Sequence, residues 1–180
     1  MKKTLIALLA AAALAGCAGP TPADYAAEKP ALDLKTYFDG EFVAHGLFTD
    51  RSGKVVRRFT VDMTGAWNGD SGTLDERFTY SDGKTERRVW HLTKQPGEGA
   101  TTRYIGRADD VVGEAVGVAS GNALNWRYTL SLPVDGKVYE VQFDDWMYLM
   151  DEQVMLNKAQ MSKFGFHLGE VTLSFTKLAK

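Results

Sequence analysis

Turn signals recur at close intervals through most of the chain, and this spacing limits the fold more than any other feature. From Gly40 onward, short segments rich in β-branched and aromatic residues are separated by clusters of Gly, Asp, Asn, Ser and Pro. Asn-Gly and Asp-Gly pairs supply the positive φ angles that tight hairpins require. Intervals of about a dozen residues suit consecutive hairpins and leave no room for crossover helices. The clusters are Asp50–Gly53, Asn68–Gly72, Ser81–Gly83, Pro96–Gly99, Ser120–Asn122 and Pro133–Gly136.

Between the turns, apolar and polar residues alternate with a period of two. In the segment 124–132, Leu, Trp and Tyr occupy one face while Asn, Arg, Thr and Ser occupy the other, and segments 58–64 and 171–176 alternate in the same way. Strands that bury one face and expose the other are typical of antiparallel sheets. The pattern predicts roughly eight to ten such strands.

An open sheet of this size would leave two long unpaired edges, and closure into a barrel removes them. The sequence therefore predicts an all-β fold, an antiparallel up-and-down β-barrel of the lipocalin-like kind. One segment, 151–163, is ambiguous, because a helix could begin at Asp151 and stop at Gly165. Its apolar spacing favours a strand. Alternation does not distinguish a barrel filled with side chains from one that holds a small ligand.

The first residues, MKKTLIALLAAAALAGC, have the layout of an export signal. Two lysines precede an apolar run that is too short to span a bilayer, and small residues follow. Leu14-Ala15-Gly16-Cys17 resembles the lipobox of bacterial lipoproteins, in which the signal is cut before the cysteine and the sulfur carries a diacylglyceryl group. Cys17 is the only cysteine, and lipidation explains a lone cysteine in an exported protein. The alternative is an ordinary signal peptide with an incidental cysteine.

These features predict a lipoprotein signal peptide at 1–16, a lipidated N-terminus and flexible tether at 17–31, and a single β-barrel domain at 32–180. The tether opens with proline and small residues. In lipoproteins of the kind that the lipobox resembles, an Asp after the cysteine retains the protein at the inner membrane. Ala18 stands there in this chain, so we expect the periplasmic leaflet of the outer membrane in a Gram-negative bacterium.

The charge balance limits the partners. Removing residues 1–16 takes away Lys2 and Lys3 and moves the formal charge from −2 to −4. A mildly acidic chain without a basic block predicts no nucleic-acid binding. The membrane is expected as a partner through the lipid anchor, and the sequence does not identify protein partners.

Five segments carry a recognisable pattern: RSGKVVRRFTVDMTGAW, SDGKTERRVWHL, GNALNWRYTLSLPVDGK, FDDWMYL and MSKFGFHLGEVTLSF. Together they span most of the mature domain, about Leu32 to Leu178, and resemble a family of small proteobacterial lipoproteins known only as a domain of unknown function. The resemblance implies a lipocalin-like barrel, an envelope location and no established activity. It defines no catalytic residues.

Aromatic residues form two pairs on neighbouring predicted strands. Trp126 and Tyr128 share one face of the first strand, and Trp146 and Tyr148 share one face of the next. Paired across a hairpin, they would form an aromatic wall inside or beneath the barrel. The wall could line a ligand pocket or simply fill the core.

The pair Asp144-Asp145 stands where the alternation changes phase. Apolar residues occupy odd positions in 139–143 and even positions in 146–150, which predicts a β-bulge at the pair. A bulge would turn one carboxylate inward, where Arg88 and Arg127 are plausible partners. The carboxylate would then form a structural ion pair, bind a ligand head group, or take part in acid/base chemistry.

The sequence predicts no metal site, cofactor or catalytic group. His45, His91 and His167 are far apart and lack the short spacing of zinc ligands. Gly69-Asp70-Ser71-Gly72 matches a serine-protease motif, but its composition is that of a hairpin turn.

We therefore expect a non-enzymatic, lipid-anchored periplasmic barrel that binds a hydrophobic or amphipathic small molecule, such as a lipid or fatty-acid derivative. The apolar tail would lie in the barrel and the head group at an open end. The candidate ligand-binding residues are Arg88, Trp126, Arg127, Tyr128, Asp144, Asp145, Trp146 and Tyr148. The alternatives are an envelope scaffold or assembly factor with a filled barrel, and a lipid-modifying barrel enzyme.

Overall fold

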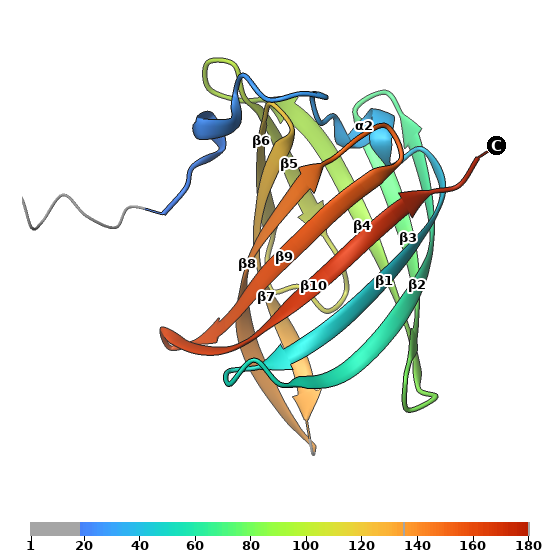
Figure 1. Cartoon of the computed structure of the whole chain (residues 1–180), viewed down its shortest axis with the longest axis vertical. Coiled ribbons are helices and arrows are strands. Elements are labelled where there is room, and N and C mark those ends of the chain that lie inside the picture. Colours follow the sequence, from blue (N-terminus) through green and yellow to red (C-terminus); the bar gives the residue numbers. More distant parts are fainter. Residues whose placement is uncertain (1–18, 135, 180) are drawn as a thin grey trace, which may run out of the picture.

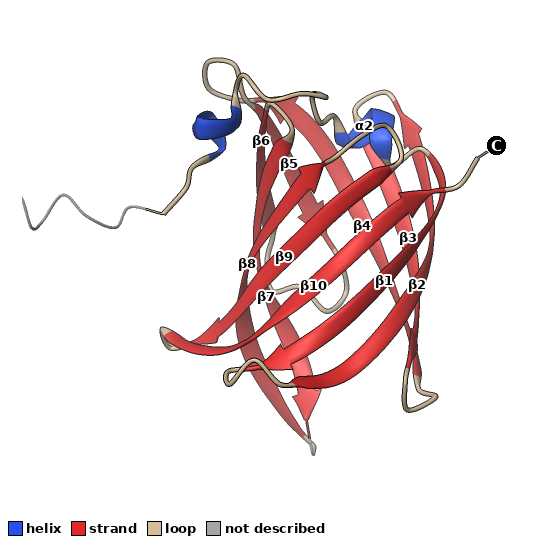
Figure 2. Cartoon of the chain, viewed as in Figure 1, coloured by secondary structure: helices blue, strands red, loops and turns tan. Residues whose placement is uncertain are grey.

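The computed structural model describes residues 19–134 and 136–179. Within these residues, ten antiparallel strands pair in chain order and β10 closes the ring against β1 (Figures 1 and 2). The predicted all-β, up-and-down barrel is confirmed. The strands are β1 (Gly40–Asp50), β2 (Val55–Asn68), β3 (Ser71–Tyr80), β4 (Thr85–Pro96), β5 (Thr102–Arg107), β6 (Ala115–Ser120), β7 (Ala123–Val134), β8 (Lys137–Leu149), β9 (Val154–Lys163) and β10 (Phe166–Lys177).

The turns form where the sequence indicates them. Each of the six predicted turn clusters connects two consecutive strands, and Gly53 and Gly83 adopt the positive φ angles of 85° and 82° that such turns need. The ambiguous segment 151–163 contributes strand β9, as predicted. All hairpins are antiparallel, so the strand ends gather at two opposite ends of the barrel (Figure 1).

Strands β5 and β6 have only six residues each, and a loop completes the wall beside them. Val111 forms an isolated antiparallel bridge with Leu130 of β7. The Val112 N–H donates to the Thr129 carbonyl at 2.9 Å, and the Ser131 N–H donates to the Asp110 carbonyl at 2.8 Å. Residues 110–112 therefore extend the wall along β7 and bring Asp110 close to the interior.

The N-terminal segment closes one end of the barrel. A single helical turn, α2 (Leu34–Tyr37), lies across this end (Figure 1), and its buried side chains pack among core residues of the strands. Phe38 contacts the rings of Phe42 and Phe175, and its carbonyl accepts from the Trp67 indole at 3.1 Å. This end, which we call the closed end, is therefore sealed by apolar packing.

Asp33 fastens this segment to the wall. Its carboxylate accepts hydrogen bonds from the Lys35 N–H at 2.9 Å, the Lys94 ammonium at 2.5 Å and the Tyr104 hydroxyl at 3.2 Å. Burial opposes ionisation, but these donors outweigh it and hold the pKa of Asp33 below its ordinary value. Asp33 is thus the N-cap of the turn. It also joins the turn to the wall, through an ion pair with Lys94 of β4 and a hydrogen bond from Tyr104 of β5.

The residues just before this segment also contact the barrel. A short 3₁₀ helix, η2 (Pro22–Tyr25), places the Tyr25 ring 5.7 Å from the Trp146 ring and 5.4 Å from the Tyr148 ring. The Leu32 N–H donates to the Gly121 carbonyl at 2.8 Å. Tyr25 of the predicted tether is therefore docked on the outer wall. Cys17 and the signal peptide lie outside the described residues.

The core is dense toward the closed end. Trp126 packs between Gly106 of β5 and Gly117 of β6, where an added Cβ would lie 2.5 and 2.3 Å from the indole ring. Only glycine allows the large ring to approach the wall so closely. Trp126 also meets Trp90 edge-on at 5.6 Å. Among the described residues, no helix is both long and apolar enough to cross a membrane.

Candidate functional site

The regular register of β8 separates the predicted site residues onto two faces. Pairing with β7 runs from Ala123↔Tyr148 to Val134↔Lys137 without a shift, and pairing with β9 is equally regular. The predicted β-bulge at Asp144-Asp145 is therefore wrong. Trp126 and Asp145, which are paired and buried, face inward, whereas Trp146 and Tyr148 face outward.

The apparent change of phase has a physical cause. From Val141 to Leu149 the odd positions of β8 remain inward, and one of them is the polar residue Asp145. Even positions remain outward, but Trp146 and Tyr148 are covered there by Tyr25. In the sequence, covered aromatic residues on an outer face look like core residues. The alternation of apolar and polar residues along β8 therefore changes phase although the strand has no bulge. The two aromatic pairs consequently lie on opposite sides of the wall and do not form the predicted single wall.

Inside the barrel, polar side chains form a cluster that we call the interior cluster: Glu76, Arg88, Asp110, Asp145 and Asn157. Glu76 and Arg88 are directly paired across β3 and β4, with 3.7 Å between the Arg88 Nη1 and Glu76 Oε2 atoms. Arg88 also donates to both Asp110 carboxylate oxygens, from Nε to Oδ1 at 3.1 Å and from Nη2 to Oδ2 at 2.7 Å. Arg88 thus faces inward, but its partners are Glu76 and Asp110 and not the predicted carboxylate of the Asp144-Asp145 pair.

Asp145 has an amide partner in place of the predicted arginine. The Asn157 side-chain amide donates to Asp145 Oδ1 and to the Trp146 carbonyl, at 3.2 Å to the latter. Both side chains are almost fully buried, with 6% and 2% exposure. Asn157 Oδ1 and Glu76 Oε2 are buried and lack a hydrogen-bond partner among the described residues. The cluster therefore offers acceptor atoms that its own donors do not satisfy.

Burial changes the protonation of two carboxyl groups in this cluster. It raises the pKa of Glu76 to about 7 although the Arg88 charge opposes it. Burial likewise raises the pKa of Asp145 to about 7, against the hydrogen bond from Asn157. Burial and the nearby Asp145 charge raise the pKa of the Tyr128 hydroxyl above its ordinary value. Near neutral pH, Glu76 and Asp145 are therefore partly protonated.

Beyond the interior cluster, toward the open end, the inward-facing residues are only half-buried. Phe59, Phe78 and Tyr80 form an aromatic group on β2 and β3, with ring centroids 5.7 to 6.0 Å apart. The Arg57 guanidinium lies 3.5 Å from the centre of the Tyr80 ring. Inward-facing Phe48 and Leu173 also remain half-buried, in contrast with the buried residues of the closed end. The lumen is therefore reached from this end, which we call the open end.

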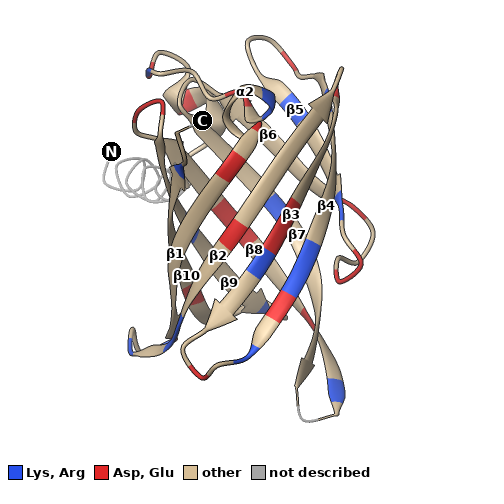
Figure 3. Ribbon diagram, turned by 90° about the vertical axis from the view of Figure 1, so that its right-hand side faces the viewer, with Lys and Arg blue, Asp and Glu red and all other residues tan. Residues whose placement is uncertain are grey.

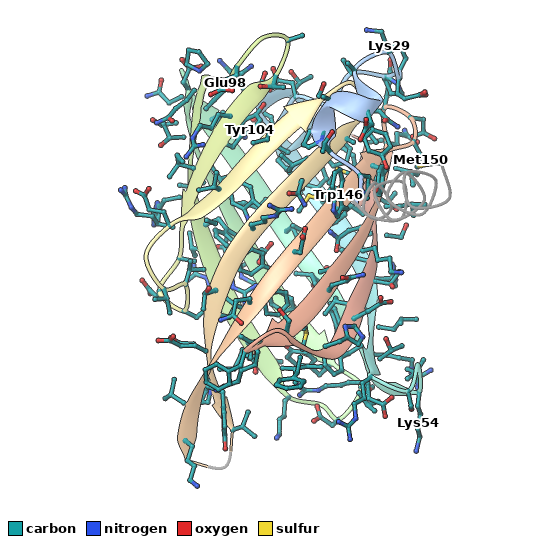
Figure 4. All side chains as sticks on the ribbon, turned by 90° about the vertical axis from the view of Figure 1, so that its left-hand side faces the viewer. Lys29, Lys54, Glu98, Tyr104, Trp146 and Met150 are labelled. Atoms are coloured by element: carbon teal, nitrogen blue, oxygen red, sulfur yellow. The ribbon has the colours of Figure 1, made fainter. Side chains whose placement is uncertain are left out.

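The remaining predicted residues form an outer-face group. Arg127 Nη2 lies 3.2 Å from Asp144 Oδ2, and the Asn125 amide donates to Asp144 Oδ1 at 2.6 Å. The Arg127 and Asp144 side chains are 64% and 45% exposed, so the ion pair contributes little to stability. Figure 4 shows Trp146 and Met150 near one end of the barrel and Lys54 near the other. The predicted ligand site is thus divided between the lumen and the outer wall.

A groove of about 480 Å³ crosses the outer wall. Its floor is the row Leu173, Gly46, Phe59 and Tyr80, which are register neighbours whose side chains point inward. Two rows of outward side chains border it: Leu156, Ser174, His45, Thr60 and Thr79 on one side, and Thr172, Leu47, Arg58 and Ser81 on the other. The groove is therefore separate from the lumen.

Sequence reasoning missed Glu76, Asn157 and Asp110. A signal existed for two of them, because Glu76 shares a face with Leu74 and Phe78, and Asn157 stands between Met155 and Ala159 on one face of β9. Counting polar residues at inward positions would have found both. Asp110 belongs to a loop and gave no periodic signal. Among the described residues, no group of three or more His, Cys, Asp and Glu could hold a metal ion.

Comparison with solved structures shows the fold. The chain is similar to the S-type phycobiliprotein lyase from Guillardia theta, with a TM-score of 0.60 and 7% sequence identity. The match covers 83% of this chain and 95% of that one. At this identity the likeness shows a shared barrel fold alone. No curated protein matches the chain.

Two protein-family models match this chain. Residues 1–18 match the prokaryotic membrane lipoprotein lipid attachment site, so the chain is a lipid-anchored membrane lipoprotein. Residues 11–177 match a second family, which spans the signal region and nearly all of the barrel. The chain therefore belongs to the family described as Protein of unknown function (DUF3833), as the sequence resemblance indicated.

Proposed function

We propose that this lipoprotein binds one hydrophobic or amphipathic small molecule, such as a lipid derivative, in the part of the lumen next to the open end. The main support for this proposal is the difference in burial of inward-facing side chains between the two ends of the barrel. Inward-facing residues at the closed end are buried, whereas Phe59, Phe78 and Tyr80 remain half-buried although they face the lumen. Apolar surface that stays accessible inside a barrel is a common setting for a small apolar ligand.

The interior cluster supports a more specific choice of ligand. Glu76 lies four residues along β3 from Tyr80, a path of about 13 Å at about 3.3 Å per residue of strand. In the interior cluster, Glu76 Oε2 and Asn157 Oδ1 lack partners among the described residues. A ligand group that donates hydrogen bonds, such as a hydroxyl or an amide, would satisfy them, whereas a carboxylate would be repelled. We therefore propose a ligand whose polar group is a donor and whose apolar part contacts the aromatic group.

The fold neighbour is compatible with this proposal. Its printed description is that of a phycobiliprotein lyase, which is a different task from the one proposed for this chain. The likeness supports only the suitability of such a barrel for a small-molecule site. We propose binding without a chemical step, because the cluster offers acceptors and proton-exchanging carboxyl groups but no paired nucleophile and base within the described contacts.

The test compares the wild type with a variant whose lumen is filled. Leu173→Trp adds a large side chain at an inward, half-buried position, and Thr172→Trp adds the same ring at the next, outward position. A saturating ligand should raise the melting temperature of the wild type and of Thr172→Trp by about 5 °C or more. Leu173→Trp should lose this shift. The probes are a monoacylglycerol, a fatty alcohol, a fatty amide and a fatty acid of equal chain length.

Two outcomes would contradict the proposal. One is an absence of any shift in the wild type together with an empty barrel in native mass spectrometry after mild extraction. The other is an equal shift in Leu173→Trp and the wild type. A larger shift with the fatty acid than with the alcohol and amide would contradict the donor preference alone.

A filled barrel that acts as a scaffold is the second candidate. The observation that favours it is the dense closed end, where Phe38, Phe42 and Leu34 from the N-terminal segment and β1 fill the lumen. In that case the binding surface would be external, and no added ligand would shift the melting temperature of the wild type or of either tryptophan variant.

We also propose the outer membrane as the site of the anchored protein, because Ala18 follows Cys17.

A further inference from the structure

The rim of the open end exposes large apolar side chains in an unusual concentration. Twelve large hydrophobic residues of the described chain are exposed, and eight of them lie on three hairpins at this end. They are Val55, Val56, Val134, Val138, Tyr139, Phe164, Phe166 and Leu168. The hairpins β7–β8, β9–β10 and β1–β2 are neighbours around the barrel, since β8 pairs with β9 and β10 with β1 (Figure 1). Their tips can therefore meet one surface together.

Phe164 is the most informative of these residues. It stands in the two-residue turn between β9 and β10 with φ of 51°, the only positive φ of a non-glycine residue in the described chain. A bulky side chain is disfavoured in this region, where Asn and Gly are usual. The ring is also 84% exposed, and Phe166 beyond it is 75% exposed. Neither local conformation nor burial in the core favours phenylalanine here, and an external apolar contact would explain the residue.

Basic residues stand among these apolar tips. The segments 50–56, 133–139 and 163–168 together hold four Lys or Arg and two Asp, a formal charge of +2 in a chain of −2. Figure 3 shows Lys and Arg on hairpin tips at this end. The Lys163 ammonium lies 4.6 Å from the Tyr139 ring and 5.2 Å from the Phe164 ring. Aromatic and aliphatic tips interleaved with cations match the interface of an anionic bilayer.

We propose that the open-end rim docks on a lipid bilayer that contains anionic phospholipid. Apolar tips would enter the headgroup region, and Arg51, Lys54 and Lys163 would lie near lipid phosphates. A second copy of this chain would present the same positive tips and be repelled, which favours the bilayer as occupant. Rim docking is independent of ligand binding in the lumen.

The docking point of the N-terminal segment lies far from this rim. Tyr25 is docked on Trp146, and from Trp146 to Val138 strand β8 extends about 26 Å, at about 3.3 Å per residue. Figure 4 shows Met150 and Lys54 toward opposite ends of the barrel. The rim can therefore meet a bilayer other than the one that holds the lipid anchor while Tyr25 remains docked.

The experiment uses the full lipidated protein, anchored in donor vesicles of phosphatidylcholine. Acceptor vesicles of phosphatidylethanolamine and phosphatidylglycerol are added, and donor–acceptor association is measured by fluorescence energy transfer. We expect Phe164→Asn with Phe166→Ser to weaken this association about tenfold or more, because it removes two aromatic rings from the interface. Asn suits the positive φ of position 164, so the melting temperature should not fall.

The matched control is Met150→Ser, which removes a 54% exposed apolar side chain at the other end and should associate as the wild type does. Added salt, or acceptors of pure phosphatidylcholine, should weaken wild-type association. Equal association of the rim variant and the wild type would overturn the proposal. So would association that requires protein on both vesicle populations, because the rim would then bind a second copy. Leu173→Trp should keep rim docking, which separates a failure of this proposal from a failure of ligand binding.

Discussion

Asp145 is a carboxyl group inside a barrel whose hydrogen-bonding partner is an amide. Because burial raises its pKa to about 7, the folded state holds a proton that the unfolded chain, with an ordinary pKa of about 3.9, has already released. Between about pH 4 and 7 the folded state therefore binds more protons. Its free energy of unfolding falls as the pH rises through this range and levels off above it. Glu76, with a pKa also near 7, acts in the same direction.

Asp145→Asn should remove the contribution of Asp145 to this dependence and keep that of Glu76. The new amide oxygen can still accept from Asn157, and no proton is bound or released. We expect the free energy of unfolding of the wild type to decline between pH 5 and pH 7 more steeply than that of the variant, by up to about 1.4 kcal/mol per pH unit. Urea unfolding at both pH values measures it. Parallel curves for the two proteins would show that Asp145 is not protonated on folding.

At the closed end, the single turn of α2 and the adjacent Phe38 help to stabilise the whole barrel. Helix α2 has a single turn, too short to be stable alone, and its position depends on the Asp33 contacts and on burial of apolar side chains. Phe38, only 3% exposed, contacts rings from both β1 and β10. It therefore links the two strands whose pairing closes the barrel.

Phe38→Ala should destabilise the protein by about 3 to 5 kcal/mol, the usual range for a buried ring replaced by alanine. Thr36→Ala, at an exposed position of the same turn, is the control and should change the free energy of unfolding by about 0.5 kcal/mol or less. Chemical unfolding measures both. Hydrogen exchange should also accelerate at the ends of β1 and β10 in Phe38→Ala, and a purely local effect within α2 would contradict this linkage.

The elements themselves were largely predictable from the sequence, and β8 shows where prediction failed. Turn residues and alternation set the strands because both depend on neighbouring residues. The phase of β8 could not be recovered, since Tyr25, more than a hundred positions earlier, covers Trp146 and Tyr148 on the outer wall. The interior cluster was missed for a similar reason. Glu76 and Arg88 meet within the β3–β4 hairpin, but Asp145 of β8 faces them only after the barrel has formed, which local patterns do not encode.

At the scale of the whole molecule, the two ends of the barrel differ in structure. The closed end carries the N-terminal segment that leads toward the lipid anchor, and the open end carries the lumen entrance and the apolar rim (Figure 1). Among the described residues, the buried core is built from Leu32 onward. Anchoring and folding should therefore be separable.

Cys17→Ser tests this separation. Loss of the sulfur that accepts the lipid should abolish incorporation of labelled palmitate and release the protein from the membrane fraction, since no other acyl chain would hold it. The melting temperature of the barrel should change by about 2 °C or less, because the buried core of the described chain is built from Leu32 onward. Ala18→Asp serves as the companion variant, which should keep its lipid and fold but move from the outer to the inner membrane. If Cys17→Ser stays with the membrane but leaves it in high salt, the open-end rim is the remaining contact, because charge-assisted docking is screened by salt whereas an acyl anchor is not.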